Sequence, residues 1–148
     1  MSSIDEKTTS NLIETLRNGE EGFRAAGEKL ANGSSAELSR EFISFSQQRA
    51  QFSAELAAVA NSYGDHVEER STIPGAMHRG WIAVKDALTG DSPEAVLKAA
   101  LTGEDHAVSE YEDAMKTDLS EGLRTIVSRQ LAAICATRDR VKLLAGQN

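Results

Sequence analysis

The sequence predicts an all-α protein built from four long helices and one short helix. Three observations support this fold class. Apolar residues recur every three or four positions along most of the chain, as they do on one face of a helix. The hydrophobic fraction is 40% but aromatic residues supply only 5%, a balance that favours helix over sheet. Glycine, serine and proline clusters divide the chain into helix-sized segments, and none of these segments requires a strand.

The first long helix is expected at 9–31 and the second at 35–63. Ser34 followed by Glu37 resembles a capping box at the start of the second helix. The polar residues 1–8 are expected to form a flexible N-terminus. The apolar stripes of these two helices consist of Leu12, Leu16, Phe23 and Leu30, then of Leu38, Phe42, Phe45, Phe52, Leu56, Val59 and Tyr63.

A short helix is expected at 75–89, followed by long helices at 93–116 and 120–144. Ser92 and Pro93 predict the start of the third long helix, because serine caps helices and proline suits the first helical position. The stripes consist of Met77, Trp81, Val84 and Leu88, then of Leu97, Leu101, Val108, Tyr111 and Met115, and last of Leu123, Val127, Ile134, Val141 and Leu144.

The lengths of the connections predict the topology. The four long helices would each measure ~35 to 43 Å, so they can lie side by side. Two connections of a few residues make their helices antiparallel neighbours, whereas the middle connection is long enough to return along the whole bundle. One long crossover is the arrangement of ferritin-like four-helix bundles. A chain of 148 residues is expected to form this bundle as a single domain.

Charge and composition exclude several classes of partner. Sixteen Lys and Arg against twenty-three Asp and Glu give a net charge of −7, which disfavours nucleic acid and anionic membrane surfaces. Cys135 is the single cysteine and cannot form an intrachain disulfide. The polar N-terminus does not resemble a signal peptide, and no apolar run reaches the roughly 20 residues of a membrane span. We therefore expect a cytoplasmic protein.

Two glutamates lie on the predicted apolar stripes. Glu20 follows Leu16 by four residues, and Glu104 follows Leu101 by three, so both are expected to point into the bundle. Nearby glycines at 19, 22 and 103 each cost about 1 kcal/mol in a helix interior. Close approach of two helices would compensate this cost and would bring the two carboxylates near one another.

Glutamines are expected at a similar depth on the partner helices. Gln48 lies between Phe45 and Phe52, and Gln130 interrupts the stripe of the last helix. Gln51 continues the polar side of the second helix. These residues predict a polar layer at the bundle centre, in which Glu20 and Glu104 share a proton or accept hydrogen bonds from the amides.

The phrases "NGEEGFR" at 18–24 and "LTGEDHA" at 101–107 resemble the ferritin-like superfamily, rubrerythrins in particular. In that superfamily, a glutamate on each of two helices and a Glu-x-x-His motif on each of the other two hold two iron ions. The resemblance implies that Glu20 and Glu104 are metal ligands. The chain is more similar to a small bacterial family of ferritin-like four-helix proteins without assigned function, through "GEEGFR", "QQRAQF", "HRGW" and "LTG".

Both Glu-x-x-His motifs of the iron proteins are absent. The corresponding stretches are "QRAQ" at 48–51 and "CATR" at 135–138, and amides are weak ligands for ferrous iron. No cofactor is therefore expected, and we interpret the chain as a non-enzymatic, stress-related or scaffold protein with a vestigial metal site. The alternative is an oxidoreductase or metal-storage protein that holds iron or another divalent metal.

The "HRGW" stretch supplies a second set of candidate residues. Met77, His78, Arg79 and Trp81 lie on the predicted short helix. Tryptophan and arginine are enriched at the energetic centres of protein interfaces. These residues predict a docking surface for the short helix or the contact of a homodimer. A phosphoacceptor role for His78 is the weaker alternative, because its neighbours do not match that motif.

Overall fold

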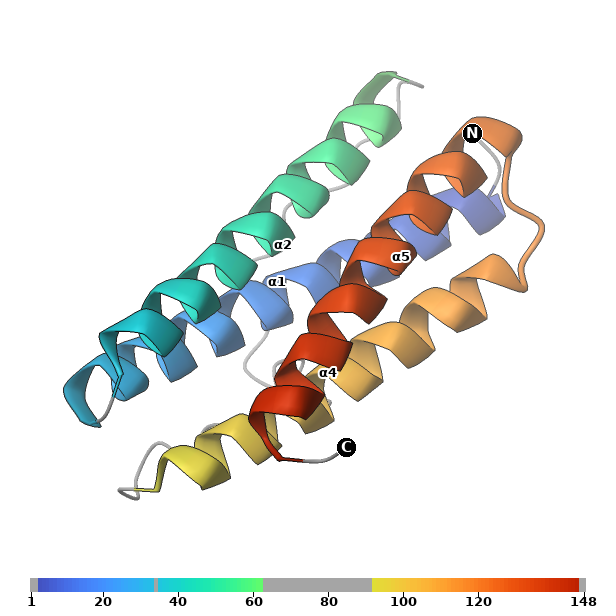
Figure 1. Ribbon diagram of the computed structural model, residues 1–148. Helices are drawn as coiled ribbons and strands as arrows, with labels where there is room; N and C mark the ends of the chain where they lie inside the picture. Colours follow the sequence, from blue (N-terminus) through green and yellow to red (C-terminus); the bar gives the residue numbers. More distant parts are fainter. Residues whose placement is uncertain (1–2, 34, 63–91, 147–148) are drawn as a thin grey trace.

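A computed structural model describes residues 3–33, 35–62 and 92–146 of the chain. The described residues form four helices and no strand, which confirms the all-α class (Figure 1). The helices are α1 (Ser3–Gly33), α2 (Ala36–Ser62), α4 (Pro93–Met115) and α5 (Glu121–Leu144). The predicted short helix at 75–89, with Met77, His78, Arg79 and Trp81, lies outside the described residues.

Both boundaries of α2, α4 and α5 agree with the sequence prediction to within one residue, whereas those of α1 do not. α1 begins at Ser3 instead of Thr9. The expectation of a flexible N-terminus at 1–8 is therefore wrong for residues 3–8. Asp5 is buried and accepts a hydrogen bond of 3.0 Å from the backbone N–H of Ser120. Because this contact satisfies a free amide at the start of α5, it ties the first turn of α1 to the rest of the bundle.

Side-chain caps explain where two of the helices begin. The Oγ of Ser92 accepts from the N–H of Ala95, with Pro93 as the first helical residue, as predicted. At α2, the capping oxygen belongs to Ser35, which accepts from the N–H of Leu38 at 3.1 Å. Ser34, which the sequence suggested for this role, lies outside the described residues. Both caps satisfy amides that have no partner within the first turn of their own helix.

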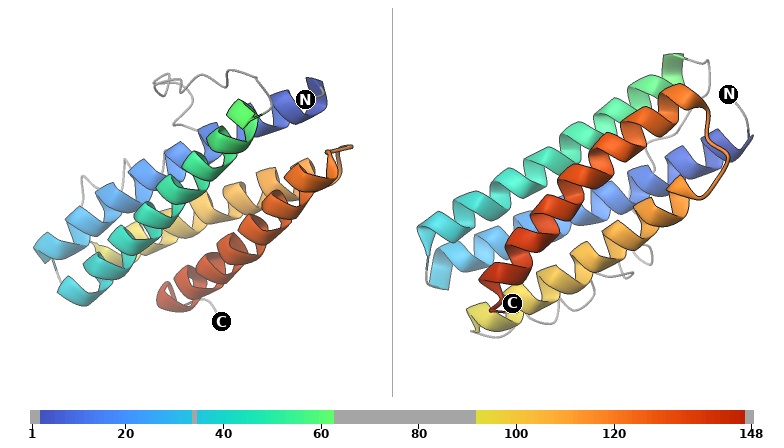
Figure 2. Two further views of the ribbon diagram at one scale, coloured as in Figure 1. Left: turned by 90° about the horizontal axis from the view of Figure 1, so that it is seen from above. Right: turned by 45° about the vertical axis from the view of Figure 1, so that its right-hand side comes forward.

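The helices pack as two antiparallel hairpins, α1 with α2 and α4 with α5 (Figures 1 and 2). α1 also packs on α4, and α2 packs less extensively on α5, whereas the pairs α2–α4 and α1–α5 contact each other least. α2 and α4 therefore lie diagonally across the bundle and run in the same direction. The end of α2 and the start of α4 consequently lie at opposite ends of the molecule (Figure 1). This arrangement places a residue of α2 opposite a residue of α4 across the bundle axis.

The core consists of two groups of apolar side chains. One group surrounds Leu12, Leu56, Tyr111 and Ile134, and the other surrounds Phe23, Phe42, Val96 and Val141. Three phenylalanines of the second group meet in pairs, with ring centroids 5.3 to 5.7 Å apart. Burial of these side chains is the main force holding the helices together. The candidate site is built mainly from polar and charged side chains.

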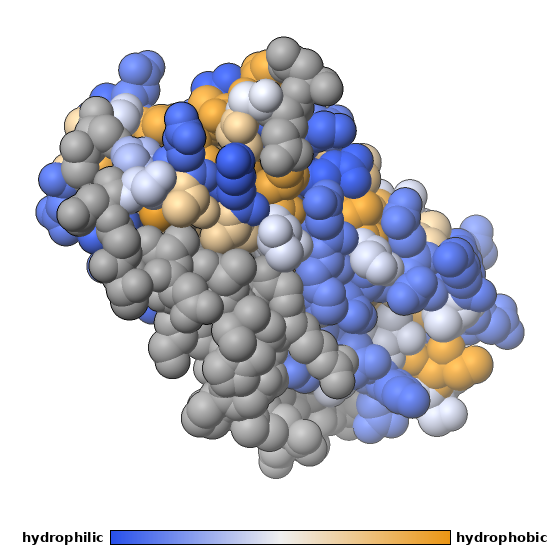
Figure 3. Space-filling model, turned by 90° about the horizontal axis from the view of Figure 1, so that it is seen from below, coloured by the Kyte–Doolittle hydropathy of each residue, from blue (hydrophilic) through white to orange (hydrophobic). Residues whose placement is uncertain are grey.

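The outer surface is predominantly hydrophilic over the described part of the face in Figure 3. Large hydrophobic side chains that are well exposed in the described residues are Ile4, at 43%, and Leu143, at 57%. Ile4 lies at the start of α1 and Leu143 at the end of α5, so these two side chains are at opposite ends of the bundle. Within the described residues, no helix combines the length and the apolar character needed to cross a membrane.

Candidate functional site

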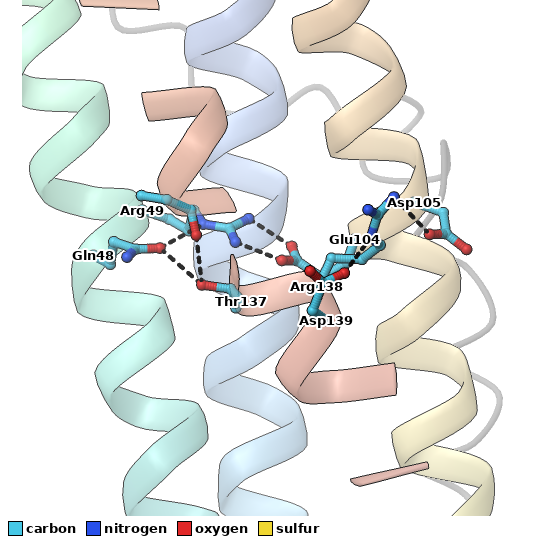
Figure 4. A network of polar contacts seen from close by, with 8 residues as sticks. Gln48, Arg49, Glu104, Asp105, Thr137, Arg138 and Asp139 are labelled. Carbon is cyan, nitrogen blue, oxygen red and sulfur yellow. Dashed lines mark hydrogen bonds and ion pairs between the residues drawn. The ribbon is translucent and has the colours of Figure 1, made fainter. Parts of the chain in front are cut away.

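A buried ion pair crosses the bundle between the diagonal helices α2 and α4. The guanidinium of Arg49 donates from Nη1 and Nη2 to the two carboxylate oxygens of Glu104, and both distances are 2.6 Å (Figure 4). The side chains are 1% and 0% exposed, respectively. Paired N–H groups facing paired oxygens form the strongest geometry available to an ion pair in proteins. The pair fixes how α2 and α4 are placed along the bundle axis.

Other side chains complete the surroundings of the guanidinium. The centre of the guanidinium, Cζ, lies 5.2 Å from the ring centroid of Phe23, within the range of a cation–π interaction. The Nε–H group donates to the side-chain oxygen of Gln48 at 3.3 Å. That oxygen also accepts from the hydroxyl of Thr137 at 3.5 Å. α1, α2, α4 and α5 therefore all contribute to this layer.

The side chain of Arg49 explains why a glycine occupies position 19 inside α1. A Cβ atom at this position would lie 3.3 Å from Nη1 of Arg49. The missing side chain therefore makes room for the guanidinium, whereas the sequence suggested close approach of two helix backbones. Gly27 does serve close packing, because a Cβ there would lie 3.2 Å from the backbone oxygen of Ser39. The two glycines thus have different structural causes.

The pKa of Glu104 depends on its burial and on the charge of Arg49 that faces it. Burial raises the pKa of Glu104 above its ordinary value, and the charge and hydrogen bonds of Arg49 act in the opposite direction. Asp105 and Arg138 lie beside the layer, with their side chains 3.9 Å apart. An arginine keeps its charge under all ordinary conditions. The bundle centre therefore contains a permanent positive charge directed at Glu104.

A second polar layer lies two turns away along α4 and α5. The hydroxyl of Tyr111 donates to Oε1 of Gln130 at 2.7 Å. The amide nitrogen of Gln130 donates to the backbone oxygen of Phe52 at 3.2 Å and to Glu55 at 2.8 Å. Arg129 also binds Glu55. Burial raises the pKa of Tyr111, so its hydroxyl stays protonated and acts as a donor.

The structure separates residues that the sequence grouped in one layer. Glu104 and Gln130 are fully buried, as expected, but they belong to different layers. Glu20 is half-buried, and its backbone oxygen accepts a hydrogen bond of 2.7 Å from the hydroxyl of Ser46. Gln48 is half-buried beside Arg49. The placement of Gln51 at the bundle centre is wrong, because its side chain is exposed.

Sequence reasoning missed Arg49, which is the central residue of the site. The buried positions of α2 are Ser39, Phe42, Ser46, Arg49, Leu56 and Ala60. This stripe has helical spacing, but polar residues occupy half of it, so the apolar pattern suggested a face centred on Phe45 and Phe52 instead. The useful signal is the alignment of Ser46 and Arg49 with Phe42 and Leu56 at intervals of three, four and seven residues.

The described side chains at the bundle centre do not form the ligand set of a metal ion. In residues 3–33, 35–62 and 92–146, no three His, Cys, Asp or Glu side chains are grouped as metal ligands would be. Both oxygens of Glu104 are bound by Arg49. A dinuclear iron site needs several anionic oxygens around the ions. The described residues at the bundle centre therefore do not fit such a site.

Over its described residues, the chain is an all-α protein of four long helices with a buried ion pair between the diagonal helices α2 and α4. Residues 6–117 match the family described as "Domain of unknown function (DUF2383)". The chain belongs to this family. The matched segment includes α2, α4 and all of α1 except its first three residues, and with them both Arg49 and Glu104. No curated protein matches the chain.

Proposed function

We propose that this chain is a non-enzymatic protein of ferritin-like architecture, in which an internal ion pair replaces the metal at the bundle centre. The observation that carries this proposal is the pairing of Arg49 with both oxygens of Glu104 inside the bundle. A divalent ion at Glu104 would have to displace the guanidinium and leave its charge buried. Leaving one member of a buried pair alone costs about 3 to 5 kcal/mol.

The direction of the helices supports the ferritin-like part of the proposal. α2 and α4 run the same way and the short connections join antiparallel neighbours (Figure 1). One long crossover between the second and third long helices is the connectivity of ferritin-like bundles. The role that follows is that of a stable helical module, a scaffold rather than a redox centre. A homodimer formed through 77–81 remains a prediction, which sedimentation equilibrium over a wide concentration range would test.

Metal analysis tests the proposal directly. Protein purified without chelators is expected to contain well below one equivalent of iron, manganese or zinc per chain. Addition of ferrous iron in the presence of oxygen should produce no oxidation beyond that of a protein-free control. A Glu20→Gln variant should give the same result as the unmodified protein.

The alternative is a metal-dependent oxidoreductase or a metal-storage protein. Two tightly bound irons per chain, lost in both Glu20→Gln and Glu104→Gln, would establish that alternative and refute the proposal. The comparison must use protein whose helical circular dichroism is unchanged, so that loss of metal reflects loss of a ligand. Iron that survives both substitutions would also refute the proposal, and it would place the metal elsewhere in the chain.

A further inference from the structure

The surroundings of Arg49 have the composition of a binding site for a guanidinium ion. A carboxylate faces the two terminal nitrogens, and an amide oxygen faces Nε. An aromatic ring lies on the α1 side, and Gly19 leaves space next to Nη1. The charged partner, Glu104, is fully buried. Each of these groups contacts a different part of the planar guanidinium.

This arrangement favours a planar, forked cation over other cations. A guanidinium presents parallel N–H groups that match the spacing of the two carboxylate oxygens, and its weak hydration lowers the cost of burial. An ammonium is a compact, strongly hydrated charge that cannot bind both oxygens in the same way. A divalent metal would find one carboxylate and one amide, too few oxygens for its usual coordination.

We infer that the bundle centre is a guanidinium-binding site whose resident ligand is the side chain of Arg49, and that it binds a free alkylguanidinium when that side chain is truncated. The test ligand is chosen to replace the atoms that Arg49→Ala removes. This substitution deletes the atoms from Cγ to the guanidinium, and ethylguanidinium contains the same set of atoms. The inference concerns the selectivity of the site and does not depend on whether metal binds elsewhere in the chain.

The test measures the thermal unfolding midpoint of Arg49→Ala with ethylguanidinium chloride present during refolding and heating. At about ten times its dissociation constant, a ligand that binds only the folded state should raise the midpoint by about 5 °C. The rise should saturate with concentration. Propylammonium chloride at equal ionic strength is the matched control and should produce no saturable rise.

The double variant Arg49→Ala/Glu104→Gln distinguishes binding at the site from a general solvent effect. It retains the space left by Arg49 but lacks the negative charge, so ethylguanidinium should not raise its midpoint. If Arg49→Ala is unfolded in buffer, the readout is recovery of helical circular dichroism on dilution from urea into ethylguanidinium or propylammonium. Recovery with ethylguanidinium alone would support the inference.

Three results would overturn the inference. These are an equal response to both cations, a response that persists in the double variant, and the absence of any response to ethylguanidinium in the folded or refolding variant. None of them bears on metal content. Iron bound elsewhere in the chain, and therefore retained in Glu104→Gln, would instead refute the proposed function while leaving the guanidinium site intact, so the two failures can be told apart.

Discussion

Removing one charge from the Arg49–Glu104 pair should destabilise the protein more than any surface substitution. Both hydrogen bonds are 2.6 Å long and both side chains are at most 1% exposed. Breaking a buried pair of this kind costs about 3 to 5 kcal/mol. In Glu104→Gln, the arginine remains charged inside the bundle, because it does not release its proton. We therefore expect a loss near the upper end of that range.

The partner substitution, Arg49→Met, should behave differently because a carboxylate can take up a proton. Burial already raises the pKa of Glu104, and without Arg49 only the smaller effect of the Arg138 charge opposes it. A folded-state pKa above the unfolded value favours folding at low pH, and this advantage is lost as the pH rises through the folded-state value. The cost of Arg49→Met should thus be smaller at pH 5.5 than at pH 7.5. Glu104→Gln lacks this dependence.

Urea unfolding followed by circular dichroism at 222 nm gives the free energies for a double-mutant cycle. The variant Arg49→Met/Glu104→Gln removes both charges. Its loss of free energy of unfolding should be smaller than the sum of the two single-variant losses by about 2 kcal/mol or more. Glu20→Gln is the control: its side chain is half-buried, and its cost should be within about 0.5 kcal/mol of zero. Additive single costs, or single costs below about 1 kcal/mol, would refute the reasoning.

Three further substitutions test the parts of the bundle around the ion pair. Tyr111→Phe leaves Oε1 of the buried Gln130 without its 2.7 Å donor and should cost about 1 to 3 kcal/mol in urea unfolding; an unchanged midpoint would contradict this. Gly27→Ala places a Cβ 3.0 Å from Cδ1 of Ile43 and 3.2 Å from a backbone oxygen, so it should lower the thermal midpoint although alanine favours helix. Combining it with Ile43→Val should restore part of the loss. Asp5→Ala removes the acceptor for the N–H of Ser120 and should cost about 1 kcal/mol, with faster hydrogen exchange at that amide; protection equal to that of the unmodified protein would show that the contact is unimportant.

The sequence alone determined the existence of the four described helices and the boundaries of α2, α4 and α5 to within one residue, because these boundaries depend on local signals. Helix starts at Pro93 and Glu121 and helix ends near Ser62 and Leu144 follow from caps, prolines and apolar spacing within a few residues of each boundary. The burial of Glu104 was also predictable, since Leu101 and Val108 place it on an unambiguous apolar stripe. On α4 and α5, the stripe read from the sequence matches the buried residues of the structure, except that Met115 and Leu144 at the helix ends are half-buried.

On α1, the predicted stripe of Leu12, Leu16, Phe23 and Leu30 is buried as well, but only the tertiary structure decided which residues of α1 and α2 occupy the bundle centre. The central positions belong to Gly19 and Arg49 rather than to their neighbours Glu20 and Gln48. Apolar periodicity cannot reveal such positions, because glycine has no side chain to count and arginine is normally solvated. Arg49 is stable inside the bundle because Glu104, 55 residues later in the chain, meets both of its terminal nitrogens. That compensation exists only once α2 and α4 face each other across the bundle, so no local stretch of sequence contains it.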